Sequence, residues 1–297
     1  MEQISHKSVI LFFIDGLGLG KNDEFNPLAQ IEDCEPLNNL ADEKKEIFKN
    51  GILVPTDPRL GIEGRPQSAS GQTTILTGKN APQILGFHKQ GFPNAILREV
   101  IAENSLFLQL KKRGIERAVF ANAYTPQFFQ ETPRWKSATT VAVEAAGMQF
   151  HRLSDLNGKQ ALFHDFTNES LIKRGVDVPL FSVTEAAEIL ANLTRTNEFV
   201  LYEHFITDKI GHDQDFEKAK THLPMLARLI RETLDKIDLE NTTFIMTSDH
   251  GNIENLSVRN HTLNDVPTII WGRKKEETAS RIKDLSDITP AILELLS

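Results

Sequence analysis

The segment TSDHGNIE, residues 247–254, places Asp249 and His250 side by side. The pair follows an apolar run, Thr242 to Met246, which is typical of a buried strand. Adjacent side chains point to opposite sides of an extended chain, so a single Asp-His pair can contribute ligands to two metal ions. Because this dipeptide is common, the interpretation depends on partners from other segments.

Further carboxylates and imidazoles lie at the ends of other apolar runs: Asp15, Asp208, His212 and His261. Open α/β sheets place their sites at the carboxyl ends of strands, so we expect these side chains to converge on one edge. Asp208 and His212 are four residues apart, and one helical turn would bring both to the same ion. This ligand chemistry suits Zn²⁺ or Mn²⁺. Any one of these residues alone would more often be a turn, cap or surface residue.

A nucleophile could come from GRPQSASGQTTILTG, residues 64–78. Pro66 and a run of small residues indicate a tight turn, and QTTILTG indicates a helix. A serine at the start of that helix would have free backbone N–H groups and the positive end of the helix beside it. A metal ion in contact would lower the pKa of the serine hydroxyl and make the alkoxide accessible.

Five short apolar runs predict the buried strands that carry these segments: Val9–Ile14, Ala118–Ala121, Phe199–Tyr202, Thr243–Met246 and Val266–Trp271. Helical spacing separates them, as in Phe107 to Arg113, Val183 to Leu193 and Asp215–Ile237. The segment SDITPAILELL predicts a last helix that is capped by Asp287 or Thr289. Strands alternating with helices predict an α/β fold with a largely parallel sheet and helices on both faces.

The bulk composition fits one large domain, residues 1–297, with 40% hydrophobic and 25% charged residues. Residues from about 124 to 180 break the alternation and are predicted to form a small cap insertion. The net charge of −8 argues against binding a nucleic acid backbone, but a small phosphorylated substrate remains compatible, because bound metal ions can invert the local field. The single cysteine, Cys34, excludes an internal disulfide. The first apolar run is too short to span a membrane, and we expect a cytoplasmic protein.

The segments together resemble the alkaline phosphatase superfamily, most closely its cofactor-independent phosphoglycerate mutase and phosphopentomutase branch. The matching pieces are IDGLGLG, SASGQ, DKIGH, SDHGNIE, NHTLNDVPTIIWG and DITPAILELL, which occur in the family's order. The middle of the chain, about residues 90–195, matches weakly. The resemblance implies a three-layer αβα sandwich that lacks the large inserted domain of those mutases.

The resemblance also implies two divalent metal ions, Zn²⁺ or Mn²⁺, with two sets of ligands: Asp208, His212 and His261 for one ion, and Asp15, Asp249 and His250 for the other. The nucleophile would complete the second set. It would be Ser68, because SASGQ is similar to the family's serine-x-x-glycine-histidine turn. Ser70 and Thr73 remain alternatives, and Gln72 stands where that turn has histidine.

Four residues near this turn are candidates for contact with substrate: Arg65, Asn80, His88 and Lys89. Arg65 and Asn80 flank the nucleophile segment, although turn and helix-end roles fit them equally well. His88 and Lys89 follow the nucleophile helix. The GLGLG sequence does not meet the G-x-G-x-x-G pattern of dinucleotide sites, so we expect no nucleotide cofactor.

The implied chemistry is phosphoryl transfer through a phosphoserine intermediate. A mutase must retain its dephosphorylated intermediate and exclude water, and the related mutases use a large basic insertion for this. The interval between Ser68 and Asp208 leaves room for only a small cap with dispersed basic residues, such as Arg134 and Arg174. We therefore predict a phosphoric ester hydrolase, a phosphatase or phosphodiesterase, with a phosphomutase as the alternative. A non-catalytic protein that binds phosphorylated ligands through metal ions is the second alternative.

Overall fold

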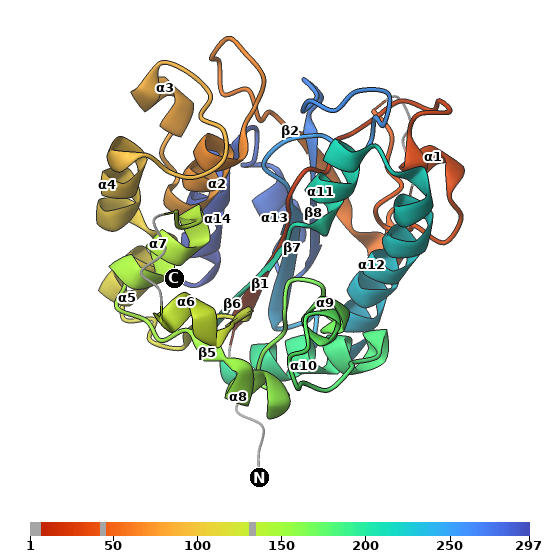
Figure 1. The fold of residues 1–297 in the computed structure, drawn as a ribbon. Coiled ribbons are helices and arrows are strands. Elements are labelled where there is room, and N and C mark those ends of the chain that lie inside the picture. The colour runs from red at the N-terminus through yellow and green to blue at the C-terminus, as the bar shows by residue number, and fades with distance from the viewer. Residues whose placement is uncertain (1–6, 42–45, 131–134) are drawn as a thin grey trace.

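A computed structural model of the protein describes residues 7–41, 46–130 and 135–297, so that Arg134 lies outside the described residues. Its centre is a six-stranded sheet in the order β2-β8-β7-β1-β6-β3 (Figure 1). The strands are β1 (Ser8–Ile14), β2 (Ile52–Thr56), β3 (Ala118–Phe120), β6 (Phe199–His204), β7 (Thr242–Thr247) and β8 (Val266–Gly272). β1 pairs in parallel with β6 and β7, and β3 pairs in parallel with β6. The predicted α/β fold with a largely parallel sheet is confirmed.

Alternate residues of β1 enter two different apolar clusters, which makes the molecule three layers thick. Val9, Leu11 and Phe13 pack on one face of the sheet. The residues between them, such as Phe12, pack on the other face, where Phe12 contacts the rings of Tyr202 and Phe244. This explains why the run is apolar throughout, since a strand that is covered on both faces has no solvent side.

Helices cover both faces (Figure 1). One face carries α2 (Ser68–Thr77), α4 (Ala95–Asn104), α5 (Leu106–Lys112), α7 (Ala138–Ala145) and α14 (Ile288–Leu295). The other face carries α1 (Pro27–Gln30), α8 (Leu153–Asn157), α9 (Glu169–Lys173), α10 (Val183–Thr196), α11 (Ile206–Asp213) and α12 (Phe216–Lys236). The remaining helices are α3 (Ala81–Leu85), α6 (Pro126–Gln130) and α13 (Lys275–Ala279), with 3-10 turns η1 (Phe48–Asn50) and η2 (Leu285–Asp287).

Strand β8 is antiparallel to both of its neighbours, β7 and β2. Its first residue therefore lies at the sheet edge where β1, β6 and β7 end. A segment that precedes β8 in the sequence can thus meet segments that follow the parallel strands. This strand direction is what allows His261, five residues before β8, to reach the same edge as Asp15.

The sequence missed one strand and only partly described the cap region. β2 has no continuous buried run, and it contains Pro55, which a strand at the sheet edge tolerates. Within residues 124–180, a short sheet joins β4 (Ala123–Tyr124) to β5 (His151–Arg152). Helix α7 of the same range packs against α2 and α4 in the helical layer, so this part of the range belongs to the main body. The boundaries of the cap stay a prediction.

The last helix begins as expected, but its predicted caps act differently. Asp287 precedes α14 without a side-chain capping bond, and its carboxylate instead accepts the backbone N–H of Lys283. Thr289 donates its hydroxyl hydrogen to the carbonyl of Ile75, which fastens α14 to α2. Among the residues that the structure describes, every helix is too short or too polar to cross a lipid bilayer.

Candidate metal centre

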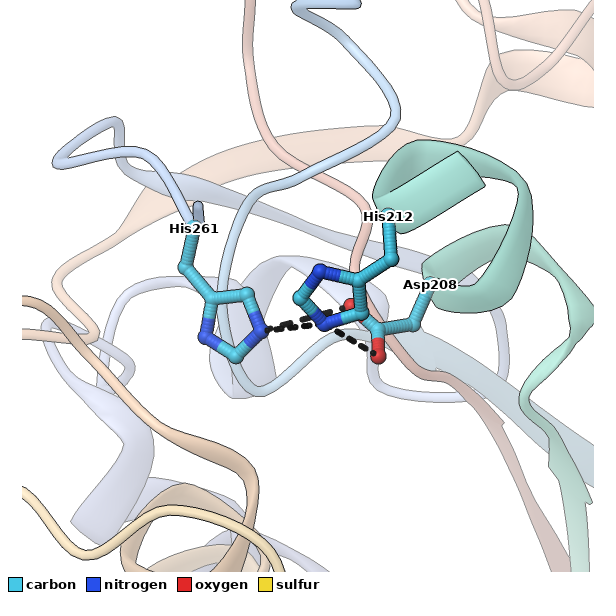
Figure 2. Close-up of side chains that lie close together, drawn as sticks. All are labelled: Asp208, His212 and His261. Atoms are coloured by element: carbon cyan, nitrogen blue, oxygen red, sulfur yellow. Dashed lines mark hydrogen bonds and ion pairs between the residues drawn. The ribbon is translucent and has the colours of Figure 1, made fainter. Parts of the chain in front are cut away.

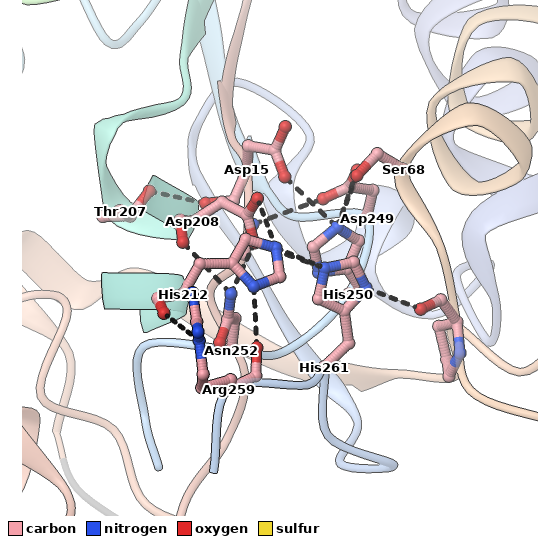
Figure 3. A network of polar contacts seen from close by, with 12 residues as sticks. Asp15, Ser68, Thr207, Asp208, His212, Asp249, His250, Asn252, Arg259 and His261 are labelled. Atoms are coloured by element: carbon pink, nitrogen blue, oxygen red, sulfur yellow. Dashed lines mark hydrogen bonds and ion pairs between the residues drawn. The ribbon is translucent and has the colours of Figure 1, made fainter. Parts of the chain in front are cut away.

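Five segments bring the predicted ligands to the carboxyl edge of the sheet (Figure 3). Asp15 directly follows β1, α11 carries Asp208 and His212, and the loop after β7 carries Asp249 and His250. The loop before β8 supplies His261, and the first residue of α2 is Ser68. The structure thus brings together all seven residues predicted as metal ligands or nucleophile. Their ligand and catalytic roles stay proposals.

One group consists of Asp208, His212 and His261 (Figure 2), whose ligand atoms all lie within 4.8 Å of one another. Nε2 of His212 lies 3.3 Å from Oδ2 of Asp208 and 3.2 Å from Nε2 of His261. Nε2 of His261 lies 3.5 Å from Oδ1 of Asp208. Four potential ligand atoms from two distant parts of the chain therefore face a common point.

The other ring nitrogens determine what these four atoms can do. Nδ1 of His212 bonds the carbonyl of Arg259 at 2.7 Å, and Nδ1 of His261 bonds the carbonyl of Pro66 at 2.9 Å. A carbonyl can only accept, so each Nδ1 carries the hydrogen, and in the neutral ring Nε2 presents a lone pair. In that neutral state, the Nε2 lone pairs of His212 and His261 face the carboxylate of Asp208, and neither imidazole offers it a hydrogen. This donor set fits a divalent cation, with the backbone carbonyls orienting the imidazole ligands.

A second group joins Asp15, Asp208 and His250 within the same 4.8 Å limit. Nε2 of His250 lies 3.2 Å from Oδ1 of Asp15 and 2.9 Å from Oγ of Ser68. Asp208 belongs to both groups, so a single carboxylate could serve two ions. Asp249 lies at the edge of this group, with its Oδ2 atom 3.5 Å from Nε2 of His250. Its predicted ligand role stays a prediction.

Ser68 is the one of the three candidate hydroxyls in this turn that faces the ligands. The Ser70 hydroxyl donates to the carbonyl of Gln67, and the Thr73 hydroxyl donates to the carbonyl of Ala69. Both are thus occupied within α2, whereas Oγ of Ser68 contacts His250. Gln67 makes no side-chain cap, and the backbone N–H of Ser70 donates to the carbonyl of Lys89, so the amides of α2 that can face a phosphate are those of Ser68 and Ala69.

The charges in the second group favour a cation. Burial raises the pKa of Asp15, although the hydrogen bond from His250 opposes this rise. Burial also raises the pKa of Asp249 well above its usual range, and the negative charge of Asp15 adds to the effect. Burial lowers the pKa of His250, but Asp249 and Asp15 outweigh it and raise the pKa to about 10. Buried carboxylates that repel each other need a positive partner, which a proton or a metal ion can provide.

Burial also opposes the ionisation of Asp208, but hydrogen bonds from Nε2 of His212 and His261, which form when these atoms carry a proton, prevail and hold its pKa below the usual range. Asp208 therefore keeps its negative charge at the place where the two ligand groups meet.

Glu203 lines the adjoining cleft, where burial and the negative charge of Asp15 raise its pKa to about 7.

Gln72 is the residue by which this chain departs from the family's turn, and it bridges two carboxylates. Its Nε2 atom donates to Oδ2 of Asp15 at 3.0 Å and to Oδ2 of Asp249 at 3.1 Å. An amide can donate without carrying charge, so it can relieve the repulsion between the two acids. Gln72 is therefore a positioning residue in this structure. The sequence identified the substitution but gave no indication of this role.

Two further residues of the SDHGNIE segment support the ligands. Asn252 donates its amide hydrogens to the carbonyl and to Oδ1 of Asp208. The buried Glu254 accepts from the backbone N–H of Gly18 and of Asn252, and from the side chains of Thr262 and Asn264. One carboxylate thus connects the loops that follow β1 and β7 with the loop before β8. Sequence reasoning missed both roles, although both residues lie inside a segment that it singled out.

Two glycines allow the loops to approach each other this closely. Gly16 has a φ of +74°, and a Cβ atom there would lie 2.8 Å from the backbone of Asp208. A Cβ atom at Gly71 would lie 2.9 Å from Cβ of Asp249. A side chain at either position would therefore displace a predicted metal ligand.

The four candidate substrate residues lie near the centre but have other contacts. Arg65 donates to the carbonyl of His261 at 2.8 Å. Asn80 caps α3 by accepting from Gln83 and donates to the carbonyl of Leu60, so both ends of its amide are occupied. The ring of His88 contacts the carbonyl of Ile62, and the ammonium group of Lys89 contacts the carbonyl of Gln90. None of the four is among the described residues that line the adjoining cleft, and their substrate roles stay predictions.

A cleft of about 640 Å³ opens beside the two groups. Asp15, Ser68 and Asp208 form one end of it, and aromatic side chains from the region between β3 and α11 form much of the rest. Its volume lies in the range of small-molecule binding pockets. A phosphate ester bound at Ser68 would therefore extend its organic part into this cleft.

The chain belongs to the Metalloenzyme superfamily, whose family model matches residues 7–297. This places it among the alkaline phosphatase-like enzymes, a group that includes the cofactor-independent phosphoglycerate mutases. The predicted family resemblance is thereby confirmed.

Comparisons with individual proteins show a partial sequence similarity and a shared fold. The chain is 28% identical over 129 residues to the 2,3-bisphosphoglycerate-independent phosphoglycerate mutase of Ehrlichia ruminantium, a match that covers 40% of this chain and 26% of that protein. It thus spans about a quarter of the length of this curated relative. Two solved structures share the fold: alkaline phosphatase from the Antarctic bacterium TAB5 and phosphoglycerate mutase from Leishmania mexicana. Their TM-scores are 0.50 and 0.53, their identities 14% and 11%, and they cover 98% and 100% of this chain and 98% and 96% of their own.

Metal binding is expected to weaken as the pH falls. A hydrogen bond to Asp208 raises the pKa of His212 above its ordinary value of 6.5, so in the metal-free protein protons compete for Nε2 already above that pH. Affinity for Mn²⁺ should fall by about tenfold per pH unit once one proton must be displaced. Calorimetric titration of the metal-free protein between about pH 8 and about pH 5 measures this slope. His212→Gln should reduce this slope without abolishing it, because the pKa of His250 is about 10 and metal must still displace its proton. His88→Gln should leave the slope unchanged, and a Kd that is independent of pH would contradict the assignment.

Proposed function

We propose that the protein is a metal-dependent phosphoric ester hydrolase that forms a phosphoserine intermediate at Ser68. The observation that carries this proposal is the position of the Ser68 hydroxyl beside two overlapping groups of carboxylates and imidazoles. The residues that would hold the ions are Asp208, His212 and His261 in one group, and Asp15 and His250, with Asp208 or Asp249, in the other. Two divalent ions, when bound, supply Lewis acidity that lowers the pKa of the serine hydroxyl and stabilises negative charge on phosphate oxygens.

The side chains of this centre have separable tasks in the proposed reaction. Oγ of Ser68 attacks phosphorus, so that an Oγ–P bond forms while the bond to the ester oxygen breaks and the alcohol leaves with a proton. His250 orients Oγ through their contact at 2.9 Å. The first amides of α2 can donate to the phosphate oxygens. Water then cleaves the Oγ–P bond, which releases phosphate and restores the serine.

A phosphomutase is the second candidate, because the curated relatives described above are phosphoglycerate mutases. In that reaction another hydroxyl of the same substrate would take the phosphoryl group from Ser68. One observation favours hydrolysis: the cleft beside Ser68 has a volume of about 640 Å³, which leaves room for water.

Product analysis separates the two reactions. The protein loaded with Mn²⁺ or Zn²⁺ is incubated with an aryl phosphate, a phosphoglycerate and a pentose phosphate. We expect stoichiometric release of inorganic phosphate and loss of activity after chelation. Positional exchange of the phosphate without release would identify a mutase. Binding of the phosphate esters with neither product would identify a non-catalytic protein.

A further inference from the structure

The part of the cleft that lies away from the metal centre has walls made largely of aromatic rings. In one group, the ring of His164 lies 4.0 Å from the rings of both Phe163 and Phe205, as measured between ring centres. In another group, Phe128 packs on Tyr124 with a centre distance of 4.3 Å. All five of these side chains line the cleft. Ring surface of this kind favours a flat apolar group.

The rim of the cleft adds two aromatic side chains that solvent contacts. Phe92 is 45% exposed and stacks on Trp135, and Phe205 is 39% exposed. Large exposed aromatic side chains beside a cleft are typical of a surface that a ligand covers. Phe92 lies before α4 and Phe205 lies at the start of α11. A ligand that contacts both rings would therefore bridge two separate segments of the chain.

Four polar side chains of the cleft already have hydrogen-bond partners within the protein: Asn122, Tyr124, Ser137 and Thr140. The amide of Asn122 donates to the carbonyl of Glu203 and accepts its backbone N–H. The hydroxyl of Thr140 contacts those of Tyr124 and Ser137 at 2.8 and 2.9 Å. A hydroxyl-rich substrate would therefore find these four side chains already hydrogen-bonded.

The charged side chains of the cleft are few compared with its aromatic side chains. Apart from the proposed metal ligands, its lining has two cations and two acids among the described residues: Arg174, Lys209, Glu203 and Asp213. Asp213 pairs with Lys218 outside the cleft. A compact substrate with an additional carboxylate or phosphate would need a concentrated positive patch. Among the described residues, the lining offers two cations, Arg174 and Lys209, against six phenylalanine and tyrosine rings.

We propose that this cleft selects phosphate esters whose alcohol carries a planar aromatic ring over small polar esters such as those of glycerate or pentoses. The inference rests on the proposed function, because it takes Ser68 and the metal centre as the phosphate position. The ring would then contact the Phe163–His164–Phe205 group and the Tyr124–Phe128 pair, which both line the cleft. Phe92 would cover it from the rim.

Binding of phosphonates tests the selection without any turnover, because a carbon–phosphorus bond is not an ester bond. Phenylphosphonate and methylphosphonate share the same head group and differ in the ring. We expect the Mn²⁺-loaded protein to bind phenylphosphonate about tenfold more tightly in calorimetry. Phe92→Ala should remove most of this preference, while Phe92→Trp should retain it. Phe25→Ala is the matched control, because Phe25 is 47% exposed and does not line the cleft.

Two results would overturn the inference. Equal Kd values for the two phosphonates, or no binding of either, would show that the aromatic walls do not select a ring. Tighter binding of phosphonoacetate, lost in Arg174→Gln but not in Phe92→Ala, would show that the cleft selects a second anion. A failure of the proposed function would give a different result. The protein would still bind phenylphosphonate more tightly than methylphosphonate, but it would release no phosphate from any ester.

Discussion

Replacement of the serine in Ser68→Ala is expected to reduce phosphate release by at least about 1,000-fold while the metal content of the protein stays unchanged. The reason is that Oγ of Ser68 contacts His250 and faces the proposed ligand groups, and alanine cannot form the covalent intermediate. Initial rates with an aryl phosphate, together with metal analysis of the same samples, measure both quantities.

The matched control is Ser70→Ala in the same turn. Ser70 is completely buried, and its hydroxyl bonds the carbonyl of Gln67 and the backbone N–H of Lys89. Its loss should lower the thermal stability of the protein but leave turnover within about tenfold of the parent. If Ser70→Ala abolished turnover and Ser68→Ala preserved it, the nucleophile would have to be reassigned.

Asp208→Asn is expected to remove both ions, and its effect on metal binding should exceed that of any other single ligand. Asp208 belongs to both groups of ligand atoms, and hydrogen bonds with His212 and His261 keep its charge. We expect the affinity for Mn²⁺ to fall by at least about 100-fold at both sites, with turnover lost in parallel. Metal analysis after dialysis against a defined free concentration gives the number of ions retained.

Asp213→Asn serves as the control for this change. Asp213 lies on the same helix, its side chain is exposed and it pairs with Lys218. Two ions per chain should remain in this variant. If Asp208→Asn retained one ion at the parent affinity, Asp208 would serve a single site, and Asp249 would then be the carboxylate of the other.

The sequence predicted the buried strands and the edge strand β3, and it missed the other edge strand, β2. β1, β6, β7 and β8 are covered by helices or neighbouring strands, so each is a nearly continuous apolar run. β2 lies at the edge, is largely half-buried and contains Pro55, which leaves no such pattern. The sequence also does not reveal the direction of β8, because an apolar run reads the same for parallel and antiparallel pairing.

The candidate site was predictable as a set of segments but not as a set of contacts. Asp15, His250 and His261 were identified because each lies at the end of an apolar run or inside a recognisable segment. The position of Asp208 in both groups and the amide bridge from Gln72 depend on distances between loops that are far apart in the sequence. Such distances arise only when the sheet brings the loops together, and local patterns do not contain them.

The buried carboxylate of Glu254 has a consequence for the order of events in the cell. It accepts hydrogen bonds from three loops, and those loops carry Asp15, His250 and His261. All of these hydrogen bonds to the carboxylate of Glu254 come from protein groups, so they can hold the three loops in place without a metal ion. The chain would thus complete its folding first and capture its cations afterwards, unlike small zinc domains, which stay unfolded until their ion arrives.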